Sequence, residues 1–174
     1  MSENSAANIE EPLPTSPEDL LKTLQGLDIE YKYYEHQAVF TVEESSQIDA
    51  QIPGVHCRNL FLRDKKKKNF LIVLSNDTEV DLKSLQEKLG CARFSFGSPD
   101  RLWQYLGIRP GSVCPFTVIN DTEHNVQVVL DAQMMKGEIV NYHPLDNTKT
   151  IGIAPDGLLK FFAHTGHKPI TLEI

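Results

Sequence analysis

Cysteine is scarce in this 174-residue sequence, which contains only Cys57, Cys91 and Cys114. An odd number of widely spaced cysteines, with no spacing typical of a zinc site, indicates reduced thiols in a reducing compartment. The sequence also lacks any apolar run close to the ~20 residues that a membrane-spanning helix requires. Residues 1–15 contain no apolar segment of the kind found in a secretory signal. We therefore expect a cytoplasmic protein without a membrane partner.

Positive charge is also in short supply, because 17 lysines and arginines stand against 24 aspartates and glutamates, for a net charge of −7. Nonspecific binding to nucleic acid depends on neutralising phosphates, so we expect no DNA partner. The one dense basic run consists of Lys65, Lys66, Lys67 and Lys68. These lysines either form a solvated hairpin tip or contact the phosphates of an RNA.

The common catalytic motifs are absent. The sequence has no Gly-x-Ser-x-Gly elbow, Walker loop, His-Glu-x-x-His pair or Gly-x-Gly-x-x-Gly loop. His164 and His167 lie three residues apart, but Gly166 interrupts the helix between them and no acidic or cysteine partner is near in sequence. We therefore predict no metal site and no organic cofactor.

The length fits one domain of ordinary size. Residues 1–15 are polar and contain Pro12 and Pro14, which predicts a disordered tail before a single domain over 16–174. Helix-start signals stand at Ser16, Thr41, Asp81, Ser98 and Pro155. Strand-like runs cover 31–36, 59–62, 70–74, 116–119, 126–130, 138–142, 149–153 and 169–173. Because the later strands follow one another as hairpins and meanders, we expect an α+β domain with a mixed, largely antiparallel sheet flanked by helices.

A Gly-x-x-x-Pro loop spans Gly111, Ser112, Val113, Cys114 and Pro115. Gly111 can adopt a positive φ that brings a ligand close to bare backbone, and Pro115 stiffens the far end of the loop. Exposed amides in such a loop can hold a carbonyl or phosphate oxygen. An ordinary turn between two elements is the alternative interpretation of the same pattern.

Several segments, taken together and in order, match a known family. They are Glu35-His36, Val39 to Glu44, Gly54 to Asp64, Ser95 to Ser98, Gly111 to Phe116, Asn120-Asp121, Asn141 to Pro144 and Asn147-Thr148. With them the chain resembles, over residues 16–174, the prolyl-tRNA editing (YbaK/ProX-like) superfamily of aminoacyl-tRNA deacylases. Within that superfamily it is similar to the free-standing alanyl-tRNA(Pro) deacylases.

The resemblance implies hydrolysis of the ester that joins a wrong amino acid to the 3′ adenosine of tRNA. A synthetase site built for proline cannot strongly reject alanine, since each missing methylene is worth only ~1–3 kcal/mol. A second site can instead exclude proline by size. The implied partners are aminoacylated tRNA, above all tRNA(Pro), and prolyl-tRNA synthetase. No activated protein nucleophile is evident, so we expect attack by a bound water that the vicinal ribose hydroxyl helps to orient.

The resemblance also implies roles for individual residues. Arg58 stands where the family commonly has a catalytic lysine, and because a guanidinium is effectively never neutral, Arg58 is expected to hold an oxygen rather than act as a base. Gly111 and the loop after it would position the aminoacyl group through backbone amides. His143 would line the pocket, and Asn59 would orient polar groups near Arg58.

The expected walls of the pocket are Phe40, Thr41, Tyr142 and Asn147, with Tyr142 helping to set its size. Structural alternatives exist for the same residues: a helix cap for Thr41, a buried side chain for Cys114 or Asn59, an exposed strand position for Arg58, and a strand-end position for His143.

The sequence is also compatible with other functions. The same chemistry could act on cysteine, serine or threonine. A non-catalytic tRNA- or synthetase-binding module could keep the fold without the reaction, and the arginine at position 58 favours this alternative. A small-molecule hydrolase with the same fold is a further possibility.

Overall fold

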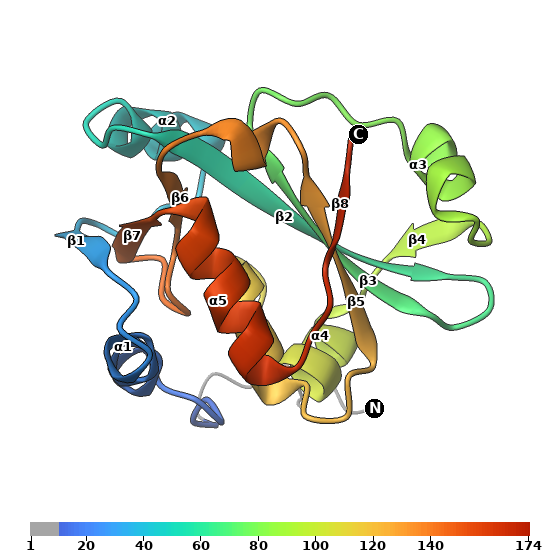
Figure 1. Cartoon of the computed structure of the whole chain (residues 1–174), viewed down its shortest axis with the longest axis horizontal. Coiled ribbons are helices and arrows are strands. Elements are labelled where there is room, and N and C mark those ends of the chain that lie inside the picture. Colours follow the sequence, from blue (N-terminus) through green and yellow to red (C-terminus); the bar gives the residue numbers. More distant parts are fainter. Residues whose placement is uncertain (1–10) are drawn as a thin grey trace.

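The computed structural model describes residues 11–174 (Figure 1). The first ten residues of the predicted tail lie outside the described residues. The last five are in contact with the domain, because Leu13 packs against the core and the Thr15 hydroxyl donates to Asn120 Oδ1 at 2.6 Å. The folded region therefore includes residues before Ser16.

The helices are α1 (Pro17–Gly26), α2 (Val42–Asp49), α3 (Leu82–Leu89), α4 (Pro99–Leu106) and α5 (Pro155–Thr165), with short 3-10 helices at η1 (Pro115–Asn120) and η2 (Met134–Lys136). The strands are β1 (Tyr31–Glu35), β2 (Val55–Asp64), β3 (Asn69–Ser75), β4 (Phe94–Phe96), β5 (Val126–Asp131), β6 (Val140–Tyr142), β7 (Lys149–Ile153) and β8 (Ile170–Leu172). The predicted mixture of helices and strands in one α+β domain is confirmed.

The strands form one mixed sheet in the order β1-β7-β6-β2-β3-β5-β8, and β4 pairs with the end of β2. Antiparallel pairs join β1 to β7, β2 to β3, β2 to β4 and β6 to β7. Parallel pairs join β2 to β6, β3 to β5 and β5 to β8. The expected meander from 126–130 to 138–142 is wrong, because β5 pairs with β3 and β8 while β6 lies on the other side of β2.

Strand β2 links the two parts of the sheet (Figure 1). Its first residues, Val55 and His56, pair with β6, and the rest of the strand pairs with β3 and β4. The functional residues expected on β2 thus lie where the β1–β7–β6 part of the sheet meets the β3–β5–β8 part.

The helix starts that the sequence signals predict are confirmed at their caps. Ser16 and Ser98 accept from the amides of Asp19 and Arg101, and Asp81 accepts from the amide of Lys83. At α2, Thr41 and Glu44 form a complete capping box. Each cap satisfies amides that the first helical turn leaves without partners.

The predicted strand over 116–119 is wrong, since these residues belong to η1. Pro115 has no N–H to offer a neighbouring strand. The amide and hydroxyl of Thr117 both donate to the Cys114 carbonyl, at 3.1 and 2.6 Å, and close a tight turn. Phe116 and Val118 are still fully buried, so their apolar character reflects core packing rather than strand structure.

Two apolar clusters cover the two faces of the sheet. The larger contains Phe61 and Leu71 with side chains from α1, α4 and α5, and the smaller contains Leu62 and Ile72 with Leu85 of α3. None of residues 42–49 of α2 is buried. Helix α2 therefore lies on the surface, and its inner side is free to border a polar cleft. Within residues 11–174, no helix has both the length and the apolar character to cross a membrane.

Candidate active site

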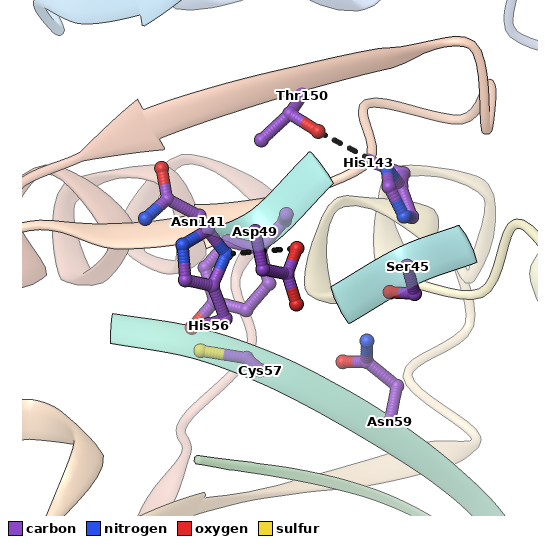
Figure 2. A pocket seen from close by; sticks show the side chains of 9 residues that line it. Ser45, Asp49, His56, Cys57, Asn59, Asn141, His143 and Thr150 are labelled. Carbon is purple, nitrogen blue, oxygen red and sulfur yellow. Dashed lines mark hydrogen bonds and ion pairs between the residues drawn. The ribbon is translucent and has the colours of Figure 1, made fainter. Parts of the chain in front are cut away.

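A polar cleft opens between α2 and the strands β2, β6 and β7 (Figure 2). Its empty volume is about 330 Å³, including the open mouth. Helix α2 contributes two lining residues, β2 three, β6 and the residue after it three, and β7 one. These residues are Ser45, Asp49, His56, Cys57, Asn59, Asn141, Tyr142, His143 and Thr150.

His143 presents a ring nitrogen with a free lone pair to this cleft. Its Nδ1 lies 2.8 Å from the Lys149 carbonyl oxygen and 3.3 Å from Thr150 Oγ1. Because a carbonyl only accepts, Nδ1 carries the hydrogen and Nε2 of the neutral ring is an acceptor. Burial lowers the pKa of His143, against the raising effect of the Lys149 carbonyl. Figure 2 shows the ring facing Ser45 across the cleft, where Nε2 can take a proton from a bound molecule.

Asn59 provides an amide without a partner. Its Oδ1 is buried, and the side chain makes no hydrogen bond among the residues that the structure describes. Figure 2 shows this side chain rising from β2 into the cleft. A buried polar group without a partner loses about 1–3 kcal/mol of solvation. The arrangement is typical of a residue that waits for a polar ligand.

Cys57 and Tyr142 form an unreactive floor. Burial raises the pKa of Cys57 to about 12, so the thiol stays protonated at neutral pH. Burial also raises the pKa of Tyr142, whose hydroxyl donates to Met134 Sδ at 3.2 Å. Neither side chain is an activated nucleophile.

An ion pair joins α2 to β2 at the edge of the cleft. Asp49 Oδ1 lies 3.2 Å from His56 Nδ1, and His56 Nε2 lies 2.7 Å from the Ile52 carbonyl oxygen. Both partners only accept hydrogen bonds, so the imidazolium form of His56 satisfies both at once. This pair holds the otherwise unburied helix α2 over the strands.

Asn141 holds β6 against the start of β2, where the two strands pair. Its Nδ2 donates to the carbonyls of Pro53 and Val55, at 3.1 and 3.2 Å. Glycines make room for it: a Cβ at Gly152 would lie 2.7 Å from Asn141 Oδ1, and Gly54 has a φ of +110°. Asn141 is therefore structural support beneath the site.

The structure brings three of the predicted residues, Asn59, Tyr142 and His143, to the same cleft. It does not bring Arg58 there. Arg58 lies on the face of β2 opposite to Cys57 and Asn59, since adjacent strand residues alternate. Its two terminal nitrogens donate to the carbonyls of Ser75 and Thr78, both at 2.8 Å. The predicted contact of Arg58 with substrate is thus not supported, and its forked side chain instead joins β2 to the loop after β3.

Phe40 and Thr41 do not line the cleft either. Phe40 is 81% exposed, so it forms no wall in this structure. Thr41 accepts from the Glu44 amide at 3.1 Å and has the helix-cap role that was the alternative for it. Asn147 donates to the Val39 carbonyl at 3.0 Å and thereby ties the β6–β7 turn to the segment before α2.

The Gly111–Pro115 loop lies behind the wall of the cleft. Gly111 has the expected positive φ, +95°, and is exposed. Cys114 is fully buried, which raises its pKa to about 11, and its thiol lies against the Leu145 amide. Phe116 packs edge-on against Tyr142, with ring centroids 5.9 Å apart. The amide of the half-buried Val113 has no acceptor in the described part of the chain, so it remains a candidate to bind a ligand oxygen.

The four lysines occupy the exposed β2–β3 tip, as predicted. Asp64 organises this tip by accepting from the amides of Lys66 and Lys68, at 2.9 and 3.0 Å. Burial raises the pKa of Asp64, but the amides of Lys68, Ala92 and Lys66 outweigh this effect and lower it overall. The lysine side chains are therefore free to meet a partner, and contact with RNA remains a prediction.

Seven residues at or beside the cleft were given no site role from the sequence: Ser45, Asp49, His56, Cys57, Asn141, Thr150 and His36. The sequence gives a weak signal for Thr150, which is a polar residue directly before the apolar run Ile151-Gly152-Ile153 of β7. The others come together only through the placement of α2 and the pairing of β1 with β7.

Comparison with known proteins identifies the family. The model of the aminoacyl-tRNA editing domain matches residues 36–161, most of the chain. The chain belongs to the aminoacyl-tRNA editing domain family. The matched range of this editing domain includes α2, the cleft and the Gly111–Pro115 loop.

Relatives of similar length support the assignment. The editing domain is 37% identical over 156 residues to the prolyl-tRNA editing protein ProX of Acetoanaerobium sticklandii, with 89% of this chain and 95% of the relative covered. It is 37% identical over 164 residues to prolyl-tRNA synthetase associated domain-containing protein 1 of Danio rerio, with coverage of 91% and 89%.

A crystal structure of a proposed trans-editing enzyme for prolyl-tRNA synthetase has the same fold. It superposes with a TM-score of 0.66 at 19% identity, covering 89% of this chain and 92% of the other.

Proposed function

We propose that this editing domain is a trans-editing enzyme that hydrolyses alanyl-tRNA(Pro) by attack of a bound water. Membership in the family makes the chain an aminoacyl-tRNA deacylase, and the choice of alanine and of water is our inference. One observation carries it: the side-chain NH2 of Asn59, which makes no hydrogen bond to a described residue, and the free Nε2 of His143 belong to side chains that face the same cleft. These two groups supply what ester hydrolysis requires, a donor for the carbonyl oxygen and a base for water.

The reaction follows from their positions. The aminoacyl ester at the 3′ end of the tRNA enters the cleft, and the Asn59 amide donates to its carbonyl oxygen. A water oxygen bonds to the carbonyl carbon while His143 Nε2 takes one water proton. When the tetrahedral intermediate collapses, the bond to the ribose oxygen breaks and this oxygen takes the proton from Nε2. The vicinal ribose hydroxyl of the substrate helps to orient the water, as the family resemblance implies.

The cleft favours a water nucleophile over a protein one. The thiol of Cys57 is protonated because its pKa is about 12, and Cys114 is buried behind the wall with a pKa of about 11. When the base and the ester are held in position, the effective concentration of the reacting groups is high and the charge that develops is stabilised. The reaction then needs no covalent intermediate.

Size selection would come from the floor. Tyr142 is 3% exposed and packed against Phe116, so it cannot swing aside to admit a larger amino acid. A methyl side chain fits above such a floor more easily than the proline ring. Cysteine, serine or threonine esters are the neighbouring substrates that the same cleft could take.

The tRNA body would approach along β2. The strand runs from the cleft at Asn59 to the lysine tip, and at about 3.3 Å per residue the separation to Lys65 is roughly 20 Å. An acceptor end held at the cleft therefore brings phosphates within reach of Lys65, Lys66, Lys67 and Lys68. Prolyl-tRNA synthetase is the partner that would present the tRNA to this otherwise acidic chain.

The test is single-turnover deacylation of alanyl-tRNA(Pro) by three proteins: the wild type, His143→Ala and Arg58→Ala. Loss of the base should slow the reaction about 10²–10⁴-fold. Arg58→Ala should retain the rate within a few-fold, and because it removes two hydrogen bonds, to the carbonyls of Ser75 and Thr78, it should lower the free energy of unfolding by about 1–3 kcal/mol. Urea denaturation at the assay temperature measures the second quantity and shows whether each variant is folded.

An unchanged rate in folded His143→Ala would refute the proposed base. If folded Arg58→Ala were inactive, substrate contact would have to be reassigned to Arg58. Binding of tRNA by the wild type without any deacylation would instead favour a non-catalytic module.

A further inference from the structure

A chain of hydrogen bonds runs from His143 through Thr150, which also lines the cleft, to His36. His143 Nδ1 lies 3.3 Å from Thr150 Oγ1, Thr150 Oγ1 lies 2.8 Å from His36 Nε2, and His36 Nδ1 lies 2.8 Å from the Gln37 carbonyl oxygen. The rings of His36 and His143 meet edge to face, with centroids 5.7 Å apart. His36 follows β1, Thr150 lies on β7 and His143 follows β6, so three separate segments build one network.

The chemistry of each partner fixes the direction of every bond. The Gln37 carbonyl only accepts, so His36 Nδ1 carries a hydrogen and Nε2 of the neutral ring accepts. The Thr150 hydroxyl must then donate to His36 Nε2. Its oxygen is left with lone pairs that face the Nδ1 hydrogen of His143, a hydrogen that the Lys149 carbonyl also accepts at 2.8 Å. In the other tautomer of His143 the Nδ1 lone pair would face the Lys149 carbonyl oxygen and the Thr150 oxygen, whose hydrogen is already donated to His36, so the network favours the hydrogen on Nδ1.

We propose that His36 and Thr150 are positioning residues that hold His143 in the tautomer and orientation whose Nε2 faces the cleft. The inference rests on the proposed function, in which Nε2 receives the water proton. An imidazole free to exchange tautomers would present an N–H to the water for part of the time and could not accept from it.

The surroundings of Thr150 make the arrangement rigid. Thr150 is 4% exposed and opposite Tyr34 in the β1–β7 pairing, and the His36 amide donates to the Thr148 carbonyl at 2.9 Å. The side chain is therefore almost fully shielded from bulk solvent. Its methyl group and backbone would remain in place if the hydroxyl alone were removed.

The network also sets how His143 responds to protonation. When Nε2 gains a proton, the positive ring still donates from Nδ1 to two oxygens, which spread the charge. A proton on His36 would reverse the bond to Thr150 and place a second positive charge beside His143. The other groups that act on His143 are Asp49 on α2 and Asp146 in the β6–β7 turn, both of which raise its pKa, and Lys149 through its carbonyl.

The experiment compares Thr150→Val, which removes only the hydroxyl, with Thr150→Ser, which retains it. Thr171→Val on the exposed edge strand β8 is the matched control. We expect Thr150→Val to lower kcat for alanyl-tRNA(Pro) about 10–100-fold, the loss typical of a partner that orients a catalytic ligand, with KM nearly unchanged. Thr150→Ser should restore kcat to within a few-fold of the wild type, and the control should match it.

A second readout is independent of activity. The ring ¹⁵N shifts of His143, assigned with His143→Gln, report which nitrogen carries the hydrogen. The wild type should show a single Nδ1–H tautomer, whereas Thr150→Val and His36→Leu should show a mixture. A kcat for folded Thr150→Val equal to that of the wild type, or a single unchanged tautomer in both variants, would overturn the inference. If the wild type itself failed to deacylate any tRNA, the proposed function would fail, and the ¹⁵N spectra would still decide whether the network orients His143.

Discussion

At the scale of single residues, His167 and Asp121 form a buried hydrogen-bonded pair outside the cleft. His167 Nε2 lies 2.9 Å from Asp121 Oδ2, and both residues are almost fully buried. Asp121 also accepts from the amides of Asn125 and Val126, each at 2.9 Å. The pair thus joins the end of α5 to the turn before β5.

His167→Ala should lower the free energy of unfolding by about 2–4 kcal/mol, because it leaves a buried carboxylate without its imidazole hydrogen-bond donor. His164→Ala is the matched control, since His164 is exposed on α5 and its loss should change stability by less than about 0.5 kcal/mol. Urea denaturation measures both. Equal stability of the two variants would show that the His167–Asp121 pair adds nothing.

The same pair predicts a pH dependence. Burial raises the pKa of Asp121, but His167 and the two amides outweigh this effect and lower it overall. A lowered folded pKa means that the stabilisation is fully present above about pH 4, the unfolded value, and is lost as the pH falls through the folded value. In His167→Ala the folded pKa should rise, so acid unfolding should begin at a higher pH than in the wild type.

At the scale of elements, the backbone of the β2–β3 tip is held by Asp64, whereas the lysine side chains of the tip are exposed. The backbone amides of Lys66 and Lys68, not their side chains, bind Asp64. The four ammonium groups can therefore be removed without disturbing the turn.

Changing Lys65, Lys66, Lys67 and Lys68 together to glutamine should weaken tRNA binding without lowering thermal stability. Each lost phosphate contact should reduce the slope of log K against log salt concentration by about 0.7–0.9. The control carries the same change at four other exposed lysines, Lys22, Lys32, Lys83 and Lys160, which lie on α1, β1, α3 and α5. Identical salt slopes for the two variants would exclude the tip as the phosphate contact.

Local chemistry made most elements predictable. Ser16, Thr41, Asp81 and Ser98 cap their helices as expected because a cap acts within one turn. The run 116–119 was wrongly predicted to be a strand, because its apolar side chains are in fact buried in a 3-10 helix. Apolar character alone does not distinguish a buried strand from a buried helical turn. The parallel neighbours of β5 were not predictable, since β3 and β8 lie far from it in sequence.

At the scale of the whole molecule, the site is an assembly of distant segments. Asn59, Tyr142 and His143 could be named from the family resemblance. Arg58 was assigned to the substrate because it stands where the family commonly has a catalytic lysine, but the alternation of β2 turns it to the other face, where it binds the carbonyls of Ser75 and Thr78. Thr150 and His36 could not be assigned to the site from the sequence, because only the pairing of β1 with β7 brings them next to His143.

The most direct test of the account compares alanyl-tRNA(Pro) with prolyl-tRNA(Pro) as substrates of the wild-type protein, with seryl- and cysteinyl-tRNA(Pro) alongside. Single-turnover rates are measured at enzyme concentrations that saturate each tRNA, so that they report the cleft rather than tRNA binding. We expect rapid loss of alanine and retention of proline. Equal hydrolysis of alanyl- and prolyl-tRNA(Pro), or hydrolysis of neither, would contradict a cleft that edits by size.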